Sequence, residues 1–452
     1  MKFIDLFAGL GGFHVALSRL GHECVYACEI DIRLNQDYYN NFKIKPDLDI
    51  RDADLKKIPK YDILCAGFPC QPFSKAGSQS GFNHKVAGDM FEVIINFLKE
   101  HKPKYFFLEN VTNLLKHNKG LTWLYMSSKL EGLGYNVGSD IISPISFNIP
   151  QNRERFYILG SLGNNKIKWP IPPKKKSITI IDILVKEPKR IVRLSKEKSI
   201  ILNIWEDFLK RAPSNYEILS PMWSMEFGAT YPFEETTPFA IGIKKLKSYK
   251  GSFGKNLSKV NDDEVLNYMP PYALYSNKKN DNEINKMKFP KWKIIFIKNC
   301  RDYYKKNKKW IDPWLKINKS KDEFQIPSFQ KFEWNCYGDD LSLNNKLVTF
   351  RSSGVRVKRI ESSPTLVNIS STGLPYITSE KRYFTLEECL NLQGFHEKKF
   401  LKFLEKNNDS FYFRALGNAV NVDIIEVIAS TFLSKKNNIV HRDVSNQLKI
   451  NF

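Results

Sequence analysis

Residues 63–74 read ILCAGFPCQPFS. Their first half is apolar and predicts a buried strand, while the two prolines of the second half predict a turn. Open α/β sheets place their chemistry where a strand runs out into a loop, and Cys70 lies at that point. A free cysteine is also among the residues most often buried for structural reasons, so this thiol by itself leaves both interpretations open.

The chain begins with another predicted strand that ends in a loop. Residues 2–6 predict a buried strand, residues 7–12 a glycine-rich turn and residues 13–20 a helix. Glycines let the backbone approach a ligand closely, as in nucleotide-binding units. Residues 23–27 predict the next strand, and Glu29 follows it where an acidic side chain accepts hydrogen bonds from ribose hydroxyls. The glycine spacing differs from the Gly-x-Gly-x-x-Gly pattern of dehydrogenases.

The positive charge is concentrated in the middle of the chain. The 452 residues carry a net charge of +22, and residues 166–360 account for +19 of it, with 40 basic and 21 acidic side chains. A solvated lysine-rich surface is the alternative explanation, but confinement between two nearly neutral segments favours a polyanionic partner. This middle segment shows few clear helical periods and interleaves lysines with aromatic rings.

The cysteines and the apolar runs indicate in which cellular compartment the protein is expected. Seven cysteines suit neither a disulfide framework nor a metal knuckle, since Cys24 and Cys28 lack a second pair at zinc spacing. We therefore expect reduced cysteines, no metal and a cytoplasmic location. No run of about 18 apolar residues occurs and the N-terminus lacks a signal-peptide core, so we expect no membrane association.

Six motifs, in order, resemble those of the DNA (cytosine-5)-methyltransferases of the bacterial restriction-modification type. The segment GFPCQPFS at residues 67–74 resembles the family's Pro-Cys motif. The other five are Asp5–Phe13 (cofactor loop), Glu109–Val111, Gln151–Phe156, Leu392–Phe395 and Gly417–Val420. Residues 350–358 and 364–366 also look similar to the family.

This resemblance implies an α/β fold. We expect the doubly wound, mostly parallel sheet of an S-adenosylmethionine-dependent methyltransferase, with a second, smaller, basic target recognition domain. Residues 1–168 would form the cofactor-binding and catalytic domain, and residues 169–360 the DNA-binding recognition domain. Residues 361–452 would return to the catalytic domain.

The resemblance also implies roles for five catalytic residues. Cys70 would add as a thiolate to C6 of a flipped-out cytosine, which makes C5 nucleophilic. Glu109, holding a proton, would bond N3 and the exocyclic amine. Because Arg153 and Arg155 are two residues apart, we expect both on one side of a strand, with Arg153 stabilising O2 and Arg155 supporting nearby acidic or phosphate groups. Asn110 would be a second polar contact to the base.

The implied cofactor is S-adenosylmethionine, with S-adenosylhomocysteine as product and no metal. In the resemblance Glu29 contacts the ribose and Asp49 lies near the adenine amino group. The expected cofactor residues are Phe7, Gly9, Leu10, Gly11, Glu29, Ile30, Asp49, Ile50, Pro69, Asn418 and Val420. The glycine-rich residues 75–89 predict a loop that closes over the site.

The expected substrate is duplex DNA of a specific sequence, methylated at cytosine C5 by a monomer. The resemblance adds a cognate restriction endonuclease acting on the same site, without a stable complex. A tRNA cytosine-5 methyltransferase of the same fold is one alternative, and the large basic middle segment argues against it. A catalytically inactive DNA-binding protein on this fold is another, and the intact motif residues argue against that.

Overall fold

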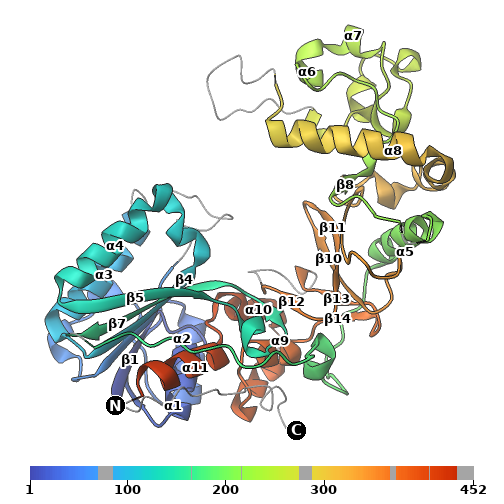
Figure 1. The fold of residues 1–452 in the computed structure, drawn as a ribbon. Coiled ribbons are helices and arrows are strands. Elements are labelled where there is room, and N and C mark those ends of the chain that lie inside the picture. The colour runs from blue at the N-terminus through green and yellow to red at the C-terminus, as the bar shows by residue number, and fades with distance from the viewer. Residues whose placement is uncertain are drawn as a thin grey trace. The chain divides into compact units, whose positions relative to one another are not determined.

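The computed structural model describes residues 1–69, 85–163, 165–214, 216–273, 288–366, 373–406 and 408–434 (Figure 1). The chain forms two compact units. The first unit, which we call the catalytic unit, contains residues 1–190, 361–371 and 385–452. The second, the basic unit, contains residues 191–360 and 372–384. The change of unit thus falls at residue 190 rather than at the expected 168, and residues 372–384 join the basic unit because their strands pair with its sheet.

A six-stranded sheet in the order β2-β1-β3-β4-β7-β5 forms the centre of the catalytic unit. Only β7 runs antiparallel to its neighbours, β4 and β5, so the expected mostly parallel sheet is confirmed. The strands are β1 (Lys2–Leu6), β2 (Glu23–Cys28), β3 (Ile63–Gly67), β4 (Tyr105–Val111), β5 (Tyr135–Ile142) and β7 (Arg155–Leu162).

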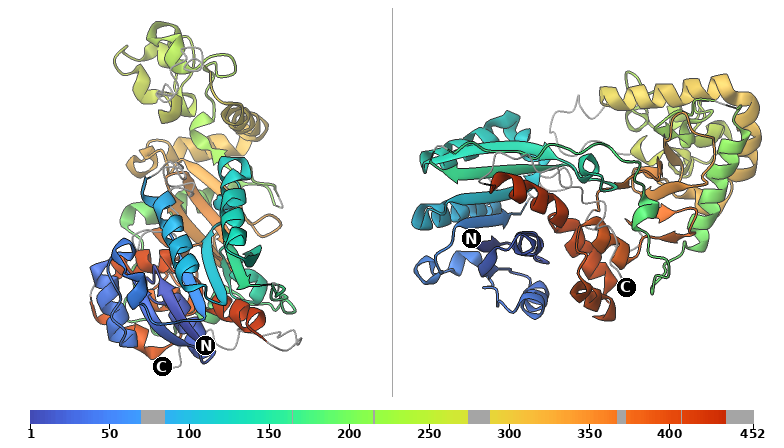
Figure 2. Two further views of the ribbon diagram at one scale, coloured as in Figure 1. Left: turned by 90° about the vertical axis from the view of Figure 1, so that its left-hand side faces the viewer. Right: turned by 60° about the horizontal axis from the view of Figure 1, so that its bottom comes forward.

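Helices cover both faces of this sheet, which makes it doubly wound (Figures 1 and 2). Alternate residues of a strand point to opposite faces. In β4, Phe106 and Leu108 join the apolar core that α3 and α4 complete, whereas Phe107 packs on Phe432 of α11 at 5.3 Å between ring centroids. The helices of the unit are α1 (Gly12–Arg19), α2 (Ile32–Phe42), α3 (Lys85–His101), α4 (Leu121–Gly132), α9 (Leu386–Leu392), α10 (Asp409–Asn418) and α11 (Val422–Phe432).

The start of α3 corrects part of the predicted closing loop. Residues 85–89, expected in that loop, belong to the first turns of α3. Residues 75–84 lie outside the described part of the chain, so the loop itself stays a prediction. At α9 a capping box begins the helix: the Thr385 side chain accepts from the Glu388 backbone N–H at 3.3 Å, and the Glu388 carboxylate accepts from the Thr385 N–H at 2.9 Å.

The C-terminal segment returns to the first helix, as expected. The Arg19 guanidinium donates to Asp423 and Glu426 of α11 at 3.1 and 3.2 Å, and to the Gly394 carbonyl at 2.8 Å. Residues 409–432, which span α10 and α11, are apolar enough by composition to cross a membrane, but 83% of the relevant window is buried inside the protein. The two helices therefore have the character of core helices of a folded domain.

The basic unit has its own sheet, in the order β14-β13-β10-β11-β9-β8. Trp205 of α5 stacks on Phe332 of β9 at 4.5 Å and anchors the core on one face of this sheet. The strands are β8 (Met222–Trp223), β9 (Lys331–Asn335), β10 (Lys346–Arg351), β11 (Gly354–Arg359), β13 (Tyr376–Ile377) and β14 (Arg382–Tyr383). The helices are α5 (Lys196–Arg211), the short α6 (Pro238–Ile241) and α7 (Ile243–Leu246), and the 28-residue α8 (Lys291–Asn318).

Close packing at Gly160 of β7 gives a test of this core. Gly160 pairs with the fully buried Phe106 of β4, and a Cβ at Gly160 would overlap the Phe106 ring. Gly160→Ala should therefore destabilise the protein by about 1–3 kcal/mol and lower its melting temperature. Gly132→Ala is the matched control, because a Cβ at this α4 position meets nothing within 4 Å. An unchanged melting temperature in Gly160→Ala would contradict the packing of β4 against β7.

Candidate active site

The turn between β1 and α1 leaves one face open. Phe7, Gly9 and Gly11 all have positive φ angles, of 56°, 54° and 84°. A Cβ on Gly11 would overlap the Phe42 ring, so that glycine is needed for packing. A Cβ on Gly9 would meet nothing within 4 Å, so the backbone there is accessible to a ligand. Leu10 between them is buried.

Glu29 fixes this turn to the end of β2. Its Oε2 accepts the Gly9 N–H at 2.7 Å, and its Oε1 accepts the Asp31 N–H at 2.8 Å. Only 8% of the residue is exposed, and this burial raises the pKa of the carboxyl although the backbone hydrogen bonds oppose the shift. The carboxylate is therefore rigidly placed, with lone pairs left to accept further hydrogen bonds.

The residues expected near the adenine differ in their exposure to solvent. Ile30 is 66% exposed, whereas Ile50 is buried. Asp49 forms an ion pair with Arg51 and accepts its backbone N–H at 3.0 Å. The hydrogen bond from the Arg51 side chain lowers the pKa of Asp49 to about 2, so its carboxylate stays ionised near neutral pH.

The end of β3 leads to the proposed nucleophile. Pro69 is exposed, and Cys70 lies outside the described residues. The six described cysteines are all buried. Burial raises the pKa of Cys24, Cys28 and Cys300 to about 12, and raises the pKa of Cys65 and Cys389 strongly. Such thiols remain protonated and are poor nucleophiles.

A carboxyl and a guanidinium pair at the ends of β4 and β7. Glu109 is level with Gly67 of β3 in the parallel register, three residues before Cys70. Its Oε1 lies 3.0 Å from the Arg155 Nε. Burial, with 7% of Glu109 exposed, raises the pKa of this carboxyl, while the charges of Arg155 and Arg153 oppose the shift.

Arg153 does not share this position, contrary to expectation. β7 begins only at Arg155, so the rule that strand residues two apart face one side does not apply to Arg153. Its buried guanidinium donates to the Leu366, Gly417 and Ala419 carbonyls at 3.2, 3.0 and 2.8 Å. These bonds fasten the C-terminal segment rather than direct the group to a base.

Asn110 is also engaged inside the protein. Its Nδ2 donates to the Phe68 carbonyl at 3.3 Å, and its Oδ1 accepts the Val111 N–H at 2.9 Å. The residue is 1% exposed. It therefore holds the chain two residues before Cys70, and its direct contact with a base stays a prediction.

The C-terminal segment reaches the cofactor turn. A Cβ on Gly12 would lie 2.5 Å from Cγ2 of Val420, and one on Gly67 would lie 3.4 Å from its Cγ1. Val420 thus packs between the first turn of α1 and the end of β3. Asn418, the last residue of α10, is exposed.

A buried polar cluster beside the turn was missed in the sequence. The Tyr38 hydroxyl lies 2.7 Å from His14 Nδ1 and 3.4 Å from Asp5 Oδ2. Burial raises the pKa of Asp5 well above its usual value. The available signal was an aspartate in an otherwise apolar strand. Elsewhere among the described residues, no group of three or more His, Cys, Asp or Glu side chains is arranged to hold a metal ion.

Many curated relatives share sequence with the chain, and three of them illustrate the similarity. The Type II methyltransferase M.BanI of Aneurinibacillus aneurinilyticus is 29% identical over 462 residues, covering 97% of both chains. M.MspI of Moraxella sp is 42% identical over 173 residues, 38% of this chain and 41% of that relative. M.HhaI of Haemophilus parahaemolyticus is 44% identical over 175 residues, 38% of this chain and 53% of that relative. The last two matches span less than two thirds of those relatives' length.

A family model covers nearly the whole chain. Residues 1–434 match the model described as C-5 cytosine-specific DNA methylase, and this range includes the turn at Gly9, the Glu109–Arg155 pair and Val420. The chain therefore belongs to the family of C-5 cytosine-specific DNA methylases, whose general reaction is methyl transfer from S-adenosylmethionine to cytosine in DNA.

Proposed function

We propose that this protein methylates C5 of a cytosine flipped out of a specific duplex DNA sequence, in the bacterial cytoplasm, as the protective enzyme of a restriction-modification system. The observation that carries the proposal is the buried Glu109–Arg155 pair, level with the end of the strand that leads to Cys70. The Type II methyltransferases among the relatives support the restriction-modification context.

The reaction begins with addition of the Cys70 thiolate to C6 of the cytosine. The C5–C6 double bond opens and negative charge moves toward N3 and O2. Glu109, whose raised pKa favours the protonated form, donates to N3. C5 then takes the methyl group that S-adenosylmethionine supplies. Loss of the C5 proton to a base, return of the N3 proton to Glu109 and elimination of the Cys70 thiolate from C6 restore the aromatic ring.

Arg155, rather than Arg153, is assigned to O2 of the cytosine. Arg155 is the guanidinium paired with Glu109, and its side chain keeps 14% exposure. A fixed cation beside the developing negative charge lowers the barrier without reorganising during the reaction. Arg153 and Asn110 serve as positioning residues, because their donors are engaged by backbone carbonyls.

The cofactor residues fit S-adenosylmethionine. The open backbone at Gly9 and the rigid Glu29 carboxylate suit a ribose, and the exposed Ile30 offers an apolar surface for a purine ring. Pro69 and Asn418 are exposed, so both are available to the ligand. Phe7, Leu10, Gly11, Asp49, Ile50 and Val420 complete the site by shaping and supporting this surface.

We assign the binding of duplex DNA to the basic unit. Residues 191–360 and 372–384 carry 34 basic and 20 acidic side chains, which is +14 of the net +22, and neutralising phosphates is the largest sequence-independent source of DNA affinity. A cognate endonuclease would compete for the same DNA sequence and need not bind this chain.

The reaction is tested by transfer of tritiated methyl groups to duplex DNA and to tRNA. Incorporation into DNA alone is the expected result, and Glu109→Gln should slow it by roughly 100-fold or more because the proton donor is lost. The wild-type rate should fall as pH rises through the raised pKa of Glu109, since the carboxyl then loses its proton, whereas the residual rate of Glu109→Gln should show no such alkaline fall. Incorporation into tRNA instead of DNA would overturn the proposed substrate.

The two arginines should differ in their effects. Arg155→Ala should lower the turnover number strongly while the protein still melts cooperatively, because only the group facing the base is lost. Arg153→Ala should instead lower the melting temperature, because three buried carbonyls lose their donors. A stable Arg153→Ala protein with a selective loss of turnover would reverse these assignments.

The affinity for S-adenosylmethionine tests the role proposed for Glu29. Glu29→Ala should weaken S-adenosylmethionine binding by about 1.5–3 kcal/mol in titration calorimetry, because charge-assisted hydrogen bonds to the ribose are lost. Glu23→Ala, at the exposed start of β2, is the matched control and should bind normally. Equal affinity in both variants would remove Glu29 from the cofactor site.

A further inference from the structure

The helix α8 of the basic unit carries an unusual excess of positive charge. Its 28 residues include eight lysines and one arginine but only two aspartates. The arginine, Arg301, is buried and pairs with Glu226 at 2.9 Å, so it adds nothing to the surface charge. The exposed charge of the helix comes from its lysines.

Five of these lysines form one straight stripe. They are Lys291, Lys298, Lys305, Lys309 and Lys316, and all are exposed. At about 100° per residue, intervals of seven and four residues keep them within about 40° of one line along the helix. At about 1.5 Å per residue the stripe is about 37 Å long.

The packing of α8 fixes which way the stripe faces. Cys300, Ile311 and Trp314 are fully buried on the opposite side of the helix. Trp314 donates its indole N–H to the Ile204 carbonyl of α5 at 3.0 Å. Rotation of the helix would expose these groups, so the lysines are held outward.

Most of the positive charge of the stripe is not paired with carboxylates of the residues that the structure describes. Lys305 lies 3.8 Å from Asp302, and in the described part of the chain no ion pair joins the other four stripe lysines to a carboxylate. By contrast, four lysines elsewhere in the unit lie 2.7–3.3 Å from carboxylates: Lys210, Lys247, Lys288 and Lys346. What distinguishes α8 is the alignment of its unpaired lysines along one line of a single helix.

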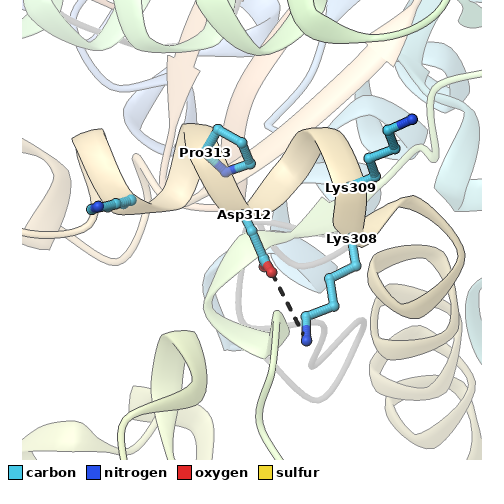
Figure 3. A pocket seen from close by; sticks show the side chains of 5 residues that line it. Lys308, Lys309, Asp312 and Pro313 are labelled. Atoms are coloured by element: carbon cyan, nitrogen blue, oxygen red, sulfur yellow. Dashed lines mark ion pairs between the residues drawn. The ribbon is translucent and has the colours of Figure 1, made fainter.

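A hollow at the C-terminal half of α8 adds an accessible surface. It is an open surface lined by five residues of α8 alone: Lys308, Lys309, Asp312, Pro313 and Lys316. Figure 3 shows Lys308 directed toward Asp312, at 3.9 Å, while Lys309 points away from that pair. The Lys309 ammonium is thus not engaged by Asp312.

We propose that this lysine stripe is a ridge that contacts phosphates of duplex DNA flanking the methylated sequence. The inference rests on the proposed function, which supplies DNA as the partner. A length of about 37 Å matches about one turn of duplex DNA, roughly ten base pairs. Lysines act as point charges toward phosphates, so the ridge adds affinity and orientation without reading sequence.

The target sequence is first mapped by sequencing 5-methylcytosine in DNA from cells that express the protein. The test then compares the affinity of the protein for a short and a long duplex that carry this target. The short duplex ends about half a turn beyond the target, and the long one extends about two turns on each side. The wild-type protein should bind the long duplex about ten-fold more tightly or better near 0.1 M salt. A variant with Lys298→Gln, Lys305→Gln, Lys309→Gln and Lys316→Gln should lose most of that difference. Its log–log salt slope should shrink by about 0.9 for each phosphate that the variant no longer neutralises.

The matched control variant carries Lys210→Gln, Lys247→Gln, Lys288→Gln and Lys346→Gln, with the same change in net charge. It should keep the length preference, and melting temperatures verify that both variants fold. Equal length preference in the wild-type and stripe variants, or an equal reduction in both variants, would overturn the ridge. Failure of the wild-type protein to methylate DNA at all would instead overturn the proposed function.

Discussion

One buried guanidinium holds three distant parts of the catalytic unit together. Arg153 donates to carbonyls at residues 366, 417 and 419, each more than 200 positions away in the chain. A charged group with 2% exposure is costly unless its donors are satisfied, so the C-terminal segment must be in place for this position to be stable. Once it is in place, Val420 packs against the turn at Gly12, and the proposed cofactor surface is completed by residues from both ends of the chain.

The same sheet explains why the Glu109 carboxyl and the Arg155 guanidinium lie next to each other. In β4, Phe106 and Leu108 contact one helical layer and Phe107 the other, which fixes the strand between two cores. Glu109 is the first residue beyond this apolar run, and the antiparallel β7 begins with Arg155 at the same edge. Burial favours the protonated carboxyl and the arginine favours the charged form, and this opposition suits the proton donation and return that we propose for Glu109.

Much of this fold could be predicted from local patterns, and the failures have physical causes. Strands at residues 2–6 and 63–67, and the capping box at Thr385, follow from apolar runs and short-range hydrogen bonding. Arg153 was misplaced because its partners lie far away in sequence. The helix α8 was missed because polar Arg301, Asn307 and Asn318 occupy buried positions and interrupt its apolar period. Their partners, including Glu226 for Arg301, could be identified only in three dimensions.

The central claim is that Cys70 attacks C6 while the Glu109–Arg155 pair accepts the developing charge. Its most direct test uses duplex DNA with 5-fluorocytosine at the target position, because fluorine cannot leave C5 as a proton and the covalent intermediate persists. The account predicts a protein–DNA complex that survives denaturing electrophoresis, forms only with S-adenosylmethionine and is absent in Cys70→Ala. A complex of the same stability in Cys70→Ala, or none with the wild-type protein on its own target, would contradict the account.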